Sequence, residues 1–100
     1  MEEKLYNYDK ERKLIKVDFG KFCDSQKNYG HNSDLIKEES YASLKNLHNF
    51  IVRNIDVCKI EFGNYTVINN EKEYKEFLKK NDDVLFYYNS ILRDKCNYQI

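Results

Sequence analysis

The sequence has no proline and no tryptophan, and it contains only three glycines and three cysteines. So few glycines leave no room for a glycine-rich phosphate cradle, and neither the P-loop nor the dinucleotide-binding spacing occurs. Three cysteines at wide spacing do not suit the disulfide framework of a small secreted protein, so we expect free thiols. The longest unbroken apolar run, Val84–Tyr88, is far too short to cross a membrane, and we expect no membrane partner.

Charge of either sign is not in excess, because 17 basic residues balance 17 acidic ones. This balance argues against a strong non-specific nucleic-acid binder, which usually carries a basic surplus, and against an acidic mimic of DNA. The N-terminus, MEEKLYNYDKE, has no apolar segment of signal-peptide length, so we expect a cytoplasmic protein. One hundred residues predict a single domain spanning residues 1–100.

The stretch Ile55–Asn69 alternates in polarity around Gly63-Asn64 and predicts a β-hairpin. Glycine supplies the positive φ that a two-residue turn needs at its first central position. In that register Ile60 pairs with Val67. The expected apolar face then consists of Cys58, Ile60, Phe62, Tyr65 and Val67. Ile68 falls on the polar face and interrupts the pattern.

A second pair of strands is expected at Lys4–Tyr8 and Leu14–Phe19, with Gly20 ending the later strand. The run Leu14–Phe22 resembles Val57–Tyr65 position by position. Their flanks do not match, so independent strands of similar pattern explain the likeness better than a duplicated unit.

Two helices and one loop are predicted outside the strands, in addition to the segment Asp82–Cys96. Apolar residues at helical spacing predict a helix that begins at Ser33 or Ser40 and ends near Asn54. Asn70, with Glu73 three residues later, predicts a helix that ends at Asn81. Turn residues and the lack of periodicity predict a loop at 23–32, which contains Cys23 and His31.

The segment Asp82–Cys96 is ambiguous, because Val84–Tyr88 has strand propensity. However, Leu85, Tyr88 and Leu92 recur at helical spacing and Asp82 can cap a helix, so we predict a helix. The expected fold is α+β, with an antiparallel sheet of about four strands in two hairpins and two or three helices packed on one face. An edge strand of such a sheet can accept a partner strand.

Candidate chemistry centres on Cys23. Cys23 and His31 are too few and too far apart for structural zinc, which needs four ligands, so we expect no metal and no cofactor. Cys23 with His31 or His48 could form a nucleophile and base, but no third residue is placed to orient them. A small enzyme with Cys23 as nucleophile is therefore the third option, and we expect a protein that is not an enzyme.

The leading functional hypothesis is a small non-enzymatic interaction module. A short, motif-poor, charge-balanced and tyrosine-rich chain with the composition of an AT-rich coding sequence is typical of a stoichiometric inhibitor. A phage-type counter-defence protein or an immunity protein, acting by steric occlusion of a protein partner, fits this description. The residues expected to bind the partner are Tyr29, His31 and Tyr87. A homodimer is the other association left open.

The alternative is a nucleic-acid-binding accessory protein that uses a basic face between Lys10 and Lys27. The expected contacts are Arg12, Lys13, Lys16 and Lys21. Acidic residues interrupt this stretch, so we favour a mixed solvated surface over a nucleic-acid footprint.

Overall fold

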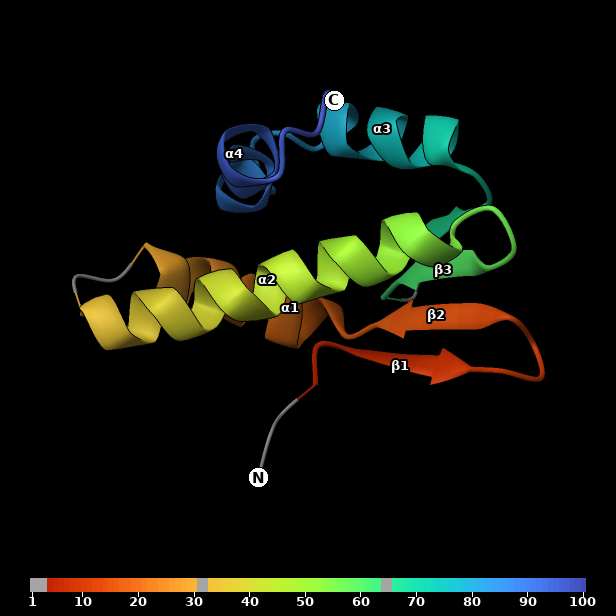
Figure 1. Cartoon of the computed structure of the whole chain (residues 1–100), viewed down its shortest axis with the longest axis horizontal. Helices are drawn as coiled ribbons and strands as arrows, with labels where there is room; N and C mark the ends of the chain where they lie inside the picture. The colour runs from red at the N-terminus through yellow and green to blue at the C-terminus, as the bar shows by residue number, and fades with distance from the viewer. Residues whose placement is uncertain (1–3, 31–32, 64–65) are drawn as a thin grey trace.

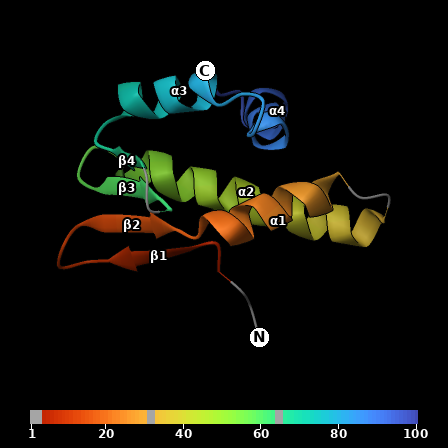
Figure 2. The same cartoon turned by 180° about the vertical axis from the view of Figure 1, so that it is seen from behind.

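Two β-hairpins form one four-stranded sheet. The computed structural model describes residues 4–30, 33–63 and 66–100, and within them the strand order is β1-β2-β3-β4 (Figures 1 and 2). The first hairpin consists of β1 (Tyr6–Asp9) and β2 (Leu14–Val17), and the second of β3 (Lys59–Phe62) and β4 (Thr66–Ile68). The α+β class, the four strands and the two hairpins are therefore confirmed.

The expectation of a purely antiparallel sheet is wrong, because the central strands β2 and β3 run parallel. Ile15 lies opposite Ile60 and Val17 lies opposite Phe62. Parallel neighbours need a long crossover, and two helices between β2 and β3 provide it. The sequence reveals each hairpin through its local pattern, whereas the way in which two hairpins join depends on contacts that no local pattern records.

The first helix of the crossover, α1 (Phe19–Tyr29), was not expected. It begins after Asp18, whose carboxylate accepts a hydrogen bond from the Lys21 N–H at 3.1 Å. This N-cap satisfies one of the free amides of the first turn. The strand therefore stops at Val17 and not at Phe19 as predicted, and Gly20 lies inside the helix instead of ending the strand.

The prediction of a loop at 23–32 is wrong up to Tyr29, because these residues form the rest of α1. The helix was missed because one of its buried positions holds a polar residue. Gln26 is buried, and its side chain donates to the Val84 carbonyl at 3.1 Å and accepts from the Tyr88 N–H at 3.0 Å. A glutamine in that position hides the apolar periodicity that marks a helix. With α1 included, the described residues contain four helices rather than two or three.

The second helix of the crossover, α2 (Asp34–Asn54), begins and ends where the sequence predicts with Ser33 as the start. Its Phe50 ring stacks on Tyr6 at 4.9 Å and meets Tyr8 edge-on at 5.5 Å, so α2 packs on the sheet. The opposite side of the sheet, which we call the open face, has no helix drawn over it in Figure 2. At 21 residues α2 has the length of a membrane span, but it is too charged, and none of the helices described here could cross a bilayer.

The second hairpin has a register one residue away from the expected one. Ile60 pairs with Ile68 rather than with Val67, because three residues, not two, separate β3 from β4. Gly63 has the expected positive φ of 63°, while Asn64 and Tyr65 lie outside the described residues. A shift of one residue exchanges the two faces of a strand, so Ile68 is 1% exposed and Val67 is 50% exposed.

The C-terminal third contains two helices, of which the first lies beside the β4 edge of the sheet and the second packs on α1 and α2 (Figure 2). In α3 (Glu71–Lys80), the Asn70 side chain accepts from the Glu73 N–H at 2.9 Å, as predicted. The helix α4 (Phe86–Lys95) confirms the helical interpretation of the ambiguous segment, although Asp82 does not cap it. Asp82 instead accepts hydrogen bonds from Asn89 and Arg93, at 2.8 and 3.2 Å.

Aromatic rings connect these layers into one core. Phe22 on α1 contacts Phe62 on β3 at 5.8 Å and Tyr88 on α4 at 4.9 Å, and Phe62 contacts Phe77 on α3 at 4.8 Å. The radius of gyration is 12.9 Å, as expected for a compact globule of about 100 residues.

Candidate functional site

Four solvent-accessible aromatic side chains gather where α1, α2 and α4 meet. We call them the aromatic patch: Tyr29, Tyr41, Phe86 and Tyr87. The Tyr29 ring lies 5.9 Å from Tyr87 and 6.5 Å from Tyr41, and the Tyr87 ring lies 5.4 Å from Phe86. Phe86 is 56% exposed and Tyr87 is 40% exposed. The patch is thus a continuous aromatic surface built from three helices.

Two contacts join α1 to the start of α4 beneath the aromatic patch. Gln26 fixes α1 to the start of α4 through its two hydrogen bonds to the main chain. Gly30, directly after α1, lies so close to Tyr87 that an added Cβ would meet the ring at 2.9 Å. The missing side chain at Gly30 therefore allows Tyr87 to lie against the end of α1, next to Tyr29.

Two lysines from α2 add positive charge to the patch. The Lys37 ammonium lies 5.5 Å from the centre of the Tyr29 ring, and the Lys45 ammonium lies 5.7 Å from the centre of the Tyr41 ring. Both distances are within the range of cation–π attraction. These contacts place a cation over one face of each ring and help to fix the ring orientations.

Two of the three residues that the sequence suggested for partner binding lie in this patch. Tyr29 and Tyr87 are 58 residues apart in the chain and contact each other edge-on, whereas His31 lies outside the described residues. Tyr41 and Phe86 were not singled out. Tyr41, which is half-buried, follows the buried Ser40 on α2, and Phe86 lies in the segment whose type the sequence left ambiguous. No local signal therefore placed Tyr41 beside Tyr29 or Phe86 beside Tyr87.

The basic residues named for nucleic-acid contact are spread over the molecule. Arg12 and Lys13 lie in the turn between β1 and β2, Lys16 lies within β2 opposite Glu61, and Lys21 lies in the first turn of α1 beyond the other end of that strand. The structure therefore brings only Arg12 and Lys13 together.

Cys23 lies on α1 rather than in a loop. Burial raises the pKa of its thiol, the neighbouring Asp24 raises the pKa further, and Lys27 lowers it. This environment favours the thiol over the reactive thiolate. The His48 ring is hydrogen-bonded elsewhere, and the part of the chain described here holds no group of three metal-ligating side chains.

A chain of buried hydroxyls and one imidazole connects α2, α3 and α4. The Nδ1 atom of His48 lies 2.8 Å from the Tyr74 hydroxyl, which lies 2.6 Å from the Tyr88 hydroxyl. Burial lowers the pKa of His48 to about 4 and raises the pKa of both tyrosines. The three side chains are closed off from solvent, so we assign them to the packing of the helices and not to a binding site.

No family model matches this chain, and comparisons with curated proteins and with solved structures find no match either.

Proposed function

We propose that the protein is a small, non-enzymatic interaction module that binds a protein partner through the aromatic patch. The observation that carries this proposal is the contact of Tyr29 with Tyr87, which extends through Tyr87 to the exposed Phe86 ring. Its form would be that of a stoichiometric inhibitor, such as a phage-type counter-defence or immunity protein, that occludes a functional surface of its partner.

The residue types in the patch support binding to protein. Tyrosine is enriched among the residues that contribute most to interfaces, because its ring buries a large apolar area while its hydroxyl keeps a hydrogen-bonding group. The rings also support one another before any partner binds. Ordered side chains lose less conformational entropy on association, so more of the contact energy appears as affinity.

A protein partner is favoured over single-stranded nucleic acid by the orientation of the rings in the aromatic patch. Bases bind aromatic side chains by stacking on an open ring face. Here Tyr29 and Tyr87 pack edge to face rather than as a parallel platform, and the chain has no net positive charge to attract a phosphate backbone.

Steric occlusion suits a chain of this size. A standard interface buries about 800 Å² on each partner, and the protein has 6797 Å² of accessible surface in total. A complex of that kind covers a substantial area of the partner without requiring any chemistry from the inhibitor.

The test is affinity capture from the native host with the tagged protein, with and without nuclease treatment. We expect one protein to be recovered at near-stoichiometric yield, unaffected by nuclease, and to be lost with the double variant Phe86→Ala/Tyr87→Ala. Truncation of central aromatic residues typically costs about 2 kcal/mol or more each, which is at least thirtyfold in affinity. The captured protein is then purified, and the affinity and inhibition are measured directly.

The matched control is Val57→Ala, which removes an exposed apolar side chain between α2 and β3, outside both the aromatic patch and the surface around β4. Circular dichroism and thermal unfolding check that each variant is folded. Capture that is equal for wild type, the double variant and the control would contradict the proposal, and recovery that disappears with nuclease would favour a nucleic-acid function.

A further inference from the structure

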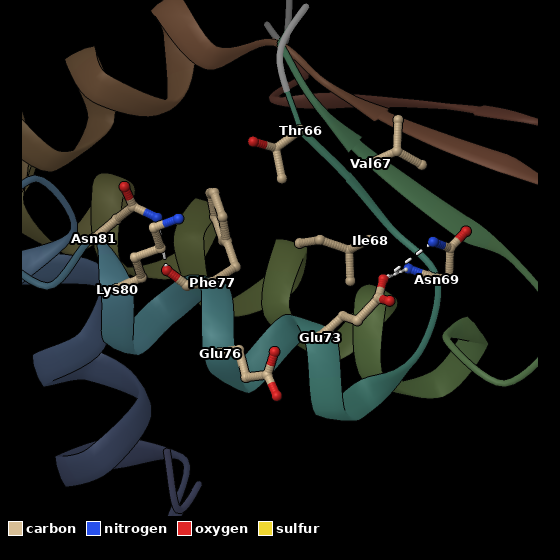
Figure 3. A pocket seen from close by; sticks show the side chains of 9 residues that line it. All are labelled: Thr66, Val67, Ile68, Asn69, Glu73, Glu76, Phe77, Lys80 and Asn81. Carbon is tan, nitrogen blue, oxygen red and sulfur yellow. Dashed lines mark hydrogen bonds between the residues drawn. The ribbon is translucent and has the colours of Figure 1, made fainter.

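A groove separates the β4 edge of the sheet from α3. It has a volume of about 500 Å³, within the range of binding clefts for small ligands and peptide segments. Figure 3 shows β4 along one side and α3 along the other, with the side chains of Ile68 and Phe77 between them. The described residues that line it are Thr66, Val67, Ile68, Asn69, Glu73, Glu76, Phe77, Lys80 and Asn81.

The hydrogen bonds of β3 determine which backbone groups face this groove. The Lys59 N–H donates to the Lys13 carbonyl at 3.0 Å, and the Gly63 N–H donates to the Val17 carbonyl at 3.1 Å. Odd-numbered residues of β3 therefore bond toward β2, and even-numbered residues bond toward β4, because backbone groups alternate along a strand.

This alternation leaves one residue of β4 directed outward. Ile60 and Phe62 pair with Ile68 and Thr66, so these pairs use the backbone groups that join β3 to β4. The N–H and C=O of Val67 consequently point away from β3, toward the free edge. In an antiparallel pair, a residue in this orientation exchanges two hydrogen bonds with the residue opposite it.

The next outward-facing amide is already occupied. The Asn69 N–H donates to Glu73 Oε1 at 2.8 Å, and the Asn69 side-chain amide donates to the same oxygen at 3.1 Å (Figure 3). This contact closes one end of the edge. Among the described residues, Val67 is thus the position at which an added strand can pair.

The charges along α3 are ordered. Glu73 lies at the Ile68 and Asn69 end of the groove, Lys80 lies at the opposite end beside Asn81, and Glu76 lies between them along α3 (Figure 3). Glu76 and Lys80 are one helical turn apart, about 6 Å along the axis. Residues i and i+2 of a strand share a face and lie about 6.6 Å apart, so the two spacings match.

We propose that this groove binds an extended segment of a partner protein with the pattern basic–apolar–acidic, which pairs antiparallel to β4. The central residue exchanges both backbone hydrogen bonds with Val67 and lies beside its side chain on the open face. The preceding basic residue, opposite Ile68, extends toward Glu76. The following acidic residue, opposite Thr66, extends toward Lys80. Opposite charges at the two ends select this direction over the reverse one.

This groove is independent of the aromatic patch. Its walls come from β4 and α3, whereas the patch is built from α1, α2 and α4. A negative result in the test of one site therefore says nothing against the other site. The variant Phe86→Ala/Tyr87→Ala should retain peptide binding through the groove.

The test is an NMR titration of the ¹⁵N-labelled full chain with the capped peptide Ser-Lys-Val-Glu-Ser. Two peptides serve as controls: Ser-Glu-Val-Lys-Ser, with the charges reversed, and the first peptide with its valine N-methylated. We expect saturable shifts at the amides of Val67, Glu76 and Lys80, about fivefold weaker binding of the reversed peptide from the loss of two exposed ion pairs, and loss of binding on N-methylation.

The double variant Glu76→Lys/Lys80→Glu keeps the composition of α3 and exchanges its charges. It should prefer the reversed peptide by a similar factor, which a change in stability alone cannot produce. The inference is overturned by the absence of shifts at peptide concentrations up to about 5 mM, by equal binding of all three peptides, or by shifts centred on the aromatic patch. Concentration-dependent shifts at Val67 without peptide would assign the edge to a second copy of the chain and would also overturn it.

Discussion

Tyr87 lies against the main chain of Gly30 so closely that a methyl group there would be 2.9 Å from both Cζ and the hydroxyl oxygen of its ring. The φ angle of Gly30 is −80°, which any residue can adopt. Glycine is therefore needed at this position for space and not for backbone conformation. This contact sets the position of Tyr87 beside Tyr29.

The first prediction is that Gly30→Ala weakens partner binding with little effect on stability. The ring of Tyr87 is at the surface and can move, so we expect the free energy of unfolding to change by about 0.5 kcal/mol or less. The displaced ring should reduce the affinity of the captured partner about tenfold, within the range of hot-spot effects. Urea unfolding and calorimetric titration measure the two quantities.

Gly20→Ala is the matched control for that variant. A Cβ at Gly20 would meet only Asp18 Oδ1, at 3.5 Å, which is an ordinary contact. Alanine should stabilise α1 by up to about 1 kcal/mol through helix propensity and leave partner affinity unchanged. Equal partner affinities of Gly30→Ala and Gly20→Ala would show that the position of the Tyr87 ring does not affect partner binding.

The second prediction concerns the buried hydroxyl chain. Tyr74→Phe removes the central hydroxyl and leaves both His48 and the Tyr88 hydroxyl without that partner, whereas Tyr88→Phe leaves Tyr74 bonded to His48. We expect Tyr74→Phe to cost about 2–4 kcal/mol and Tyr88→Phe about 1–2 kcal/mol, since orphaned buried polar groups dominate the loss. Urea unfolding of the two variants gives the comparison, and the reverse order would show that Tyr74 is not the centre of the chain.

The third prediction is a loss of stability in mild acid that depends on His48. Burial lowers its pKa from 6.5 to about 4 in the folded protein, so the unfolded chain binds the proton more tightly. The stabilisation is fully present above pH 6.5 and is lost as the pH falls toward 4. The whole loss amounts to about 3 kcal/mol.

Unfolding free energies measured between pH 7 and pH 4 check this expectation. His48→Gln keeps a polar group beside Tyr74 but has no titrating ring, so its stability should change much less across that interval. Asp82 does not interfere, because its hydrogen bonds to Asn89 and Arg93 lower its pKa below 3.8. A wild-type curve that is flat between these pH values would rule out the burial effect.

The fourth prediction addresses Gln26. Replacement by leucine keeps an apolar stem of similar size but leaves the Val84 carbonyl and the Tyr88 N–H without their partner. We expect a cost of about 2 kcal/mol or more from two unsatisfied backbone groups. The exposed neighbour Lys27→Leu is the control and should change the stability by about 0.5 kcal/mol or less. Similar effects of the two variants would contradict the proposed attachment of α4 to α1.

Gln26 also shows where prediction from sequence fails. An apolar residue at its position would complete a helical stripe with Phe22 and Tyr29, and α1 would then be recognisable. The glutamine is buried because its two hydrogen bonds reach residues 58 and 62 positions away. The sequence contains no sign of these partners, so the segment resembled a loop.

The register of the second hairpin has a similar cause. Val67 and Ile68 are both apolar, so the sequence pattern permits either one to face the core. The loop between β3 and β4 has three residues, and this length places Ile68 inside and Val67 on the open face. That choice also directs the backbone of Val67 toward the groove, where the proposed peptide would pair.

The sequence alone determined the features that depend on neighbouring residues. These are the end of α2 at Asn54, the Asn70 cap of α3 and the positive φ of Gly63, because caps, turns and helical periodicity act over a few residues. The tertiary structure alone decided the parallel pairing of β2 with β3, the contact of Tyr29 with Tyr87 and the groove beside β4. Each of these joins segments that are distant in the chain or faces of two separate elements, so each depends on packing that no local pattern encodes.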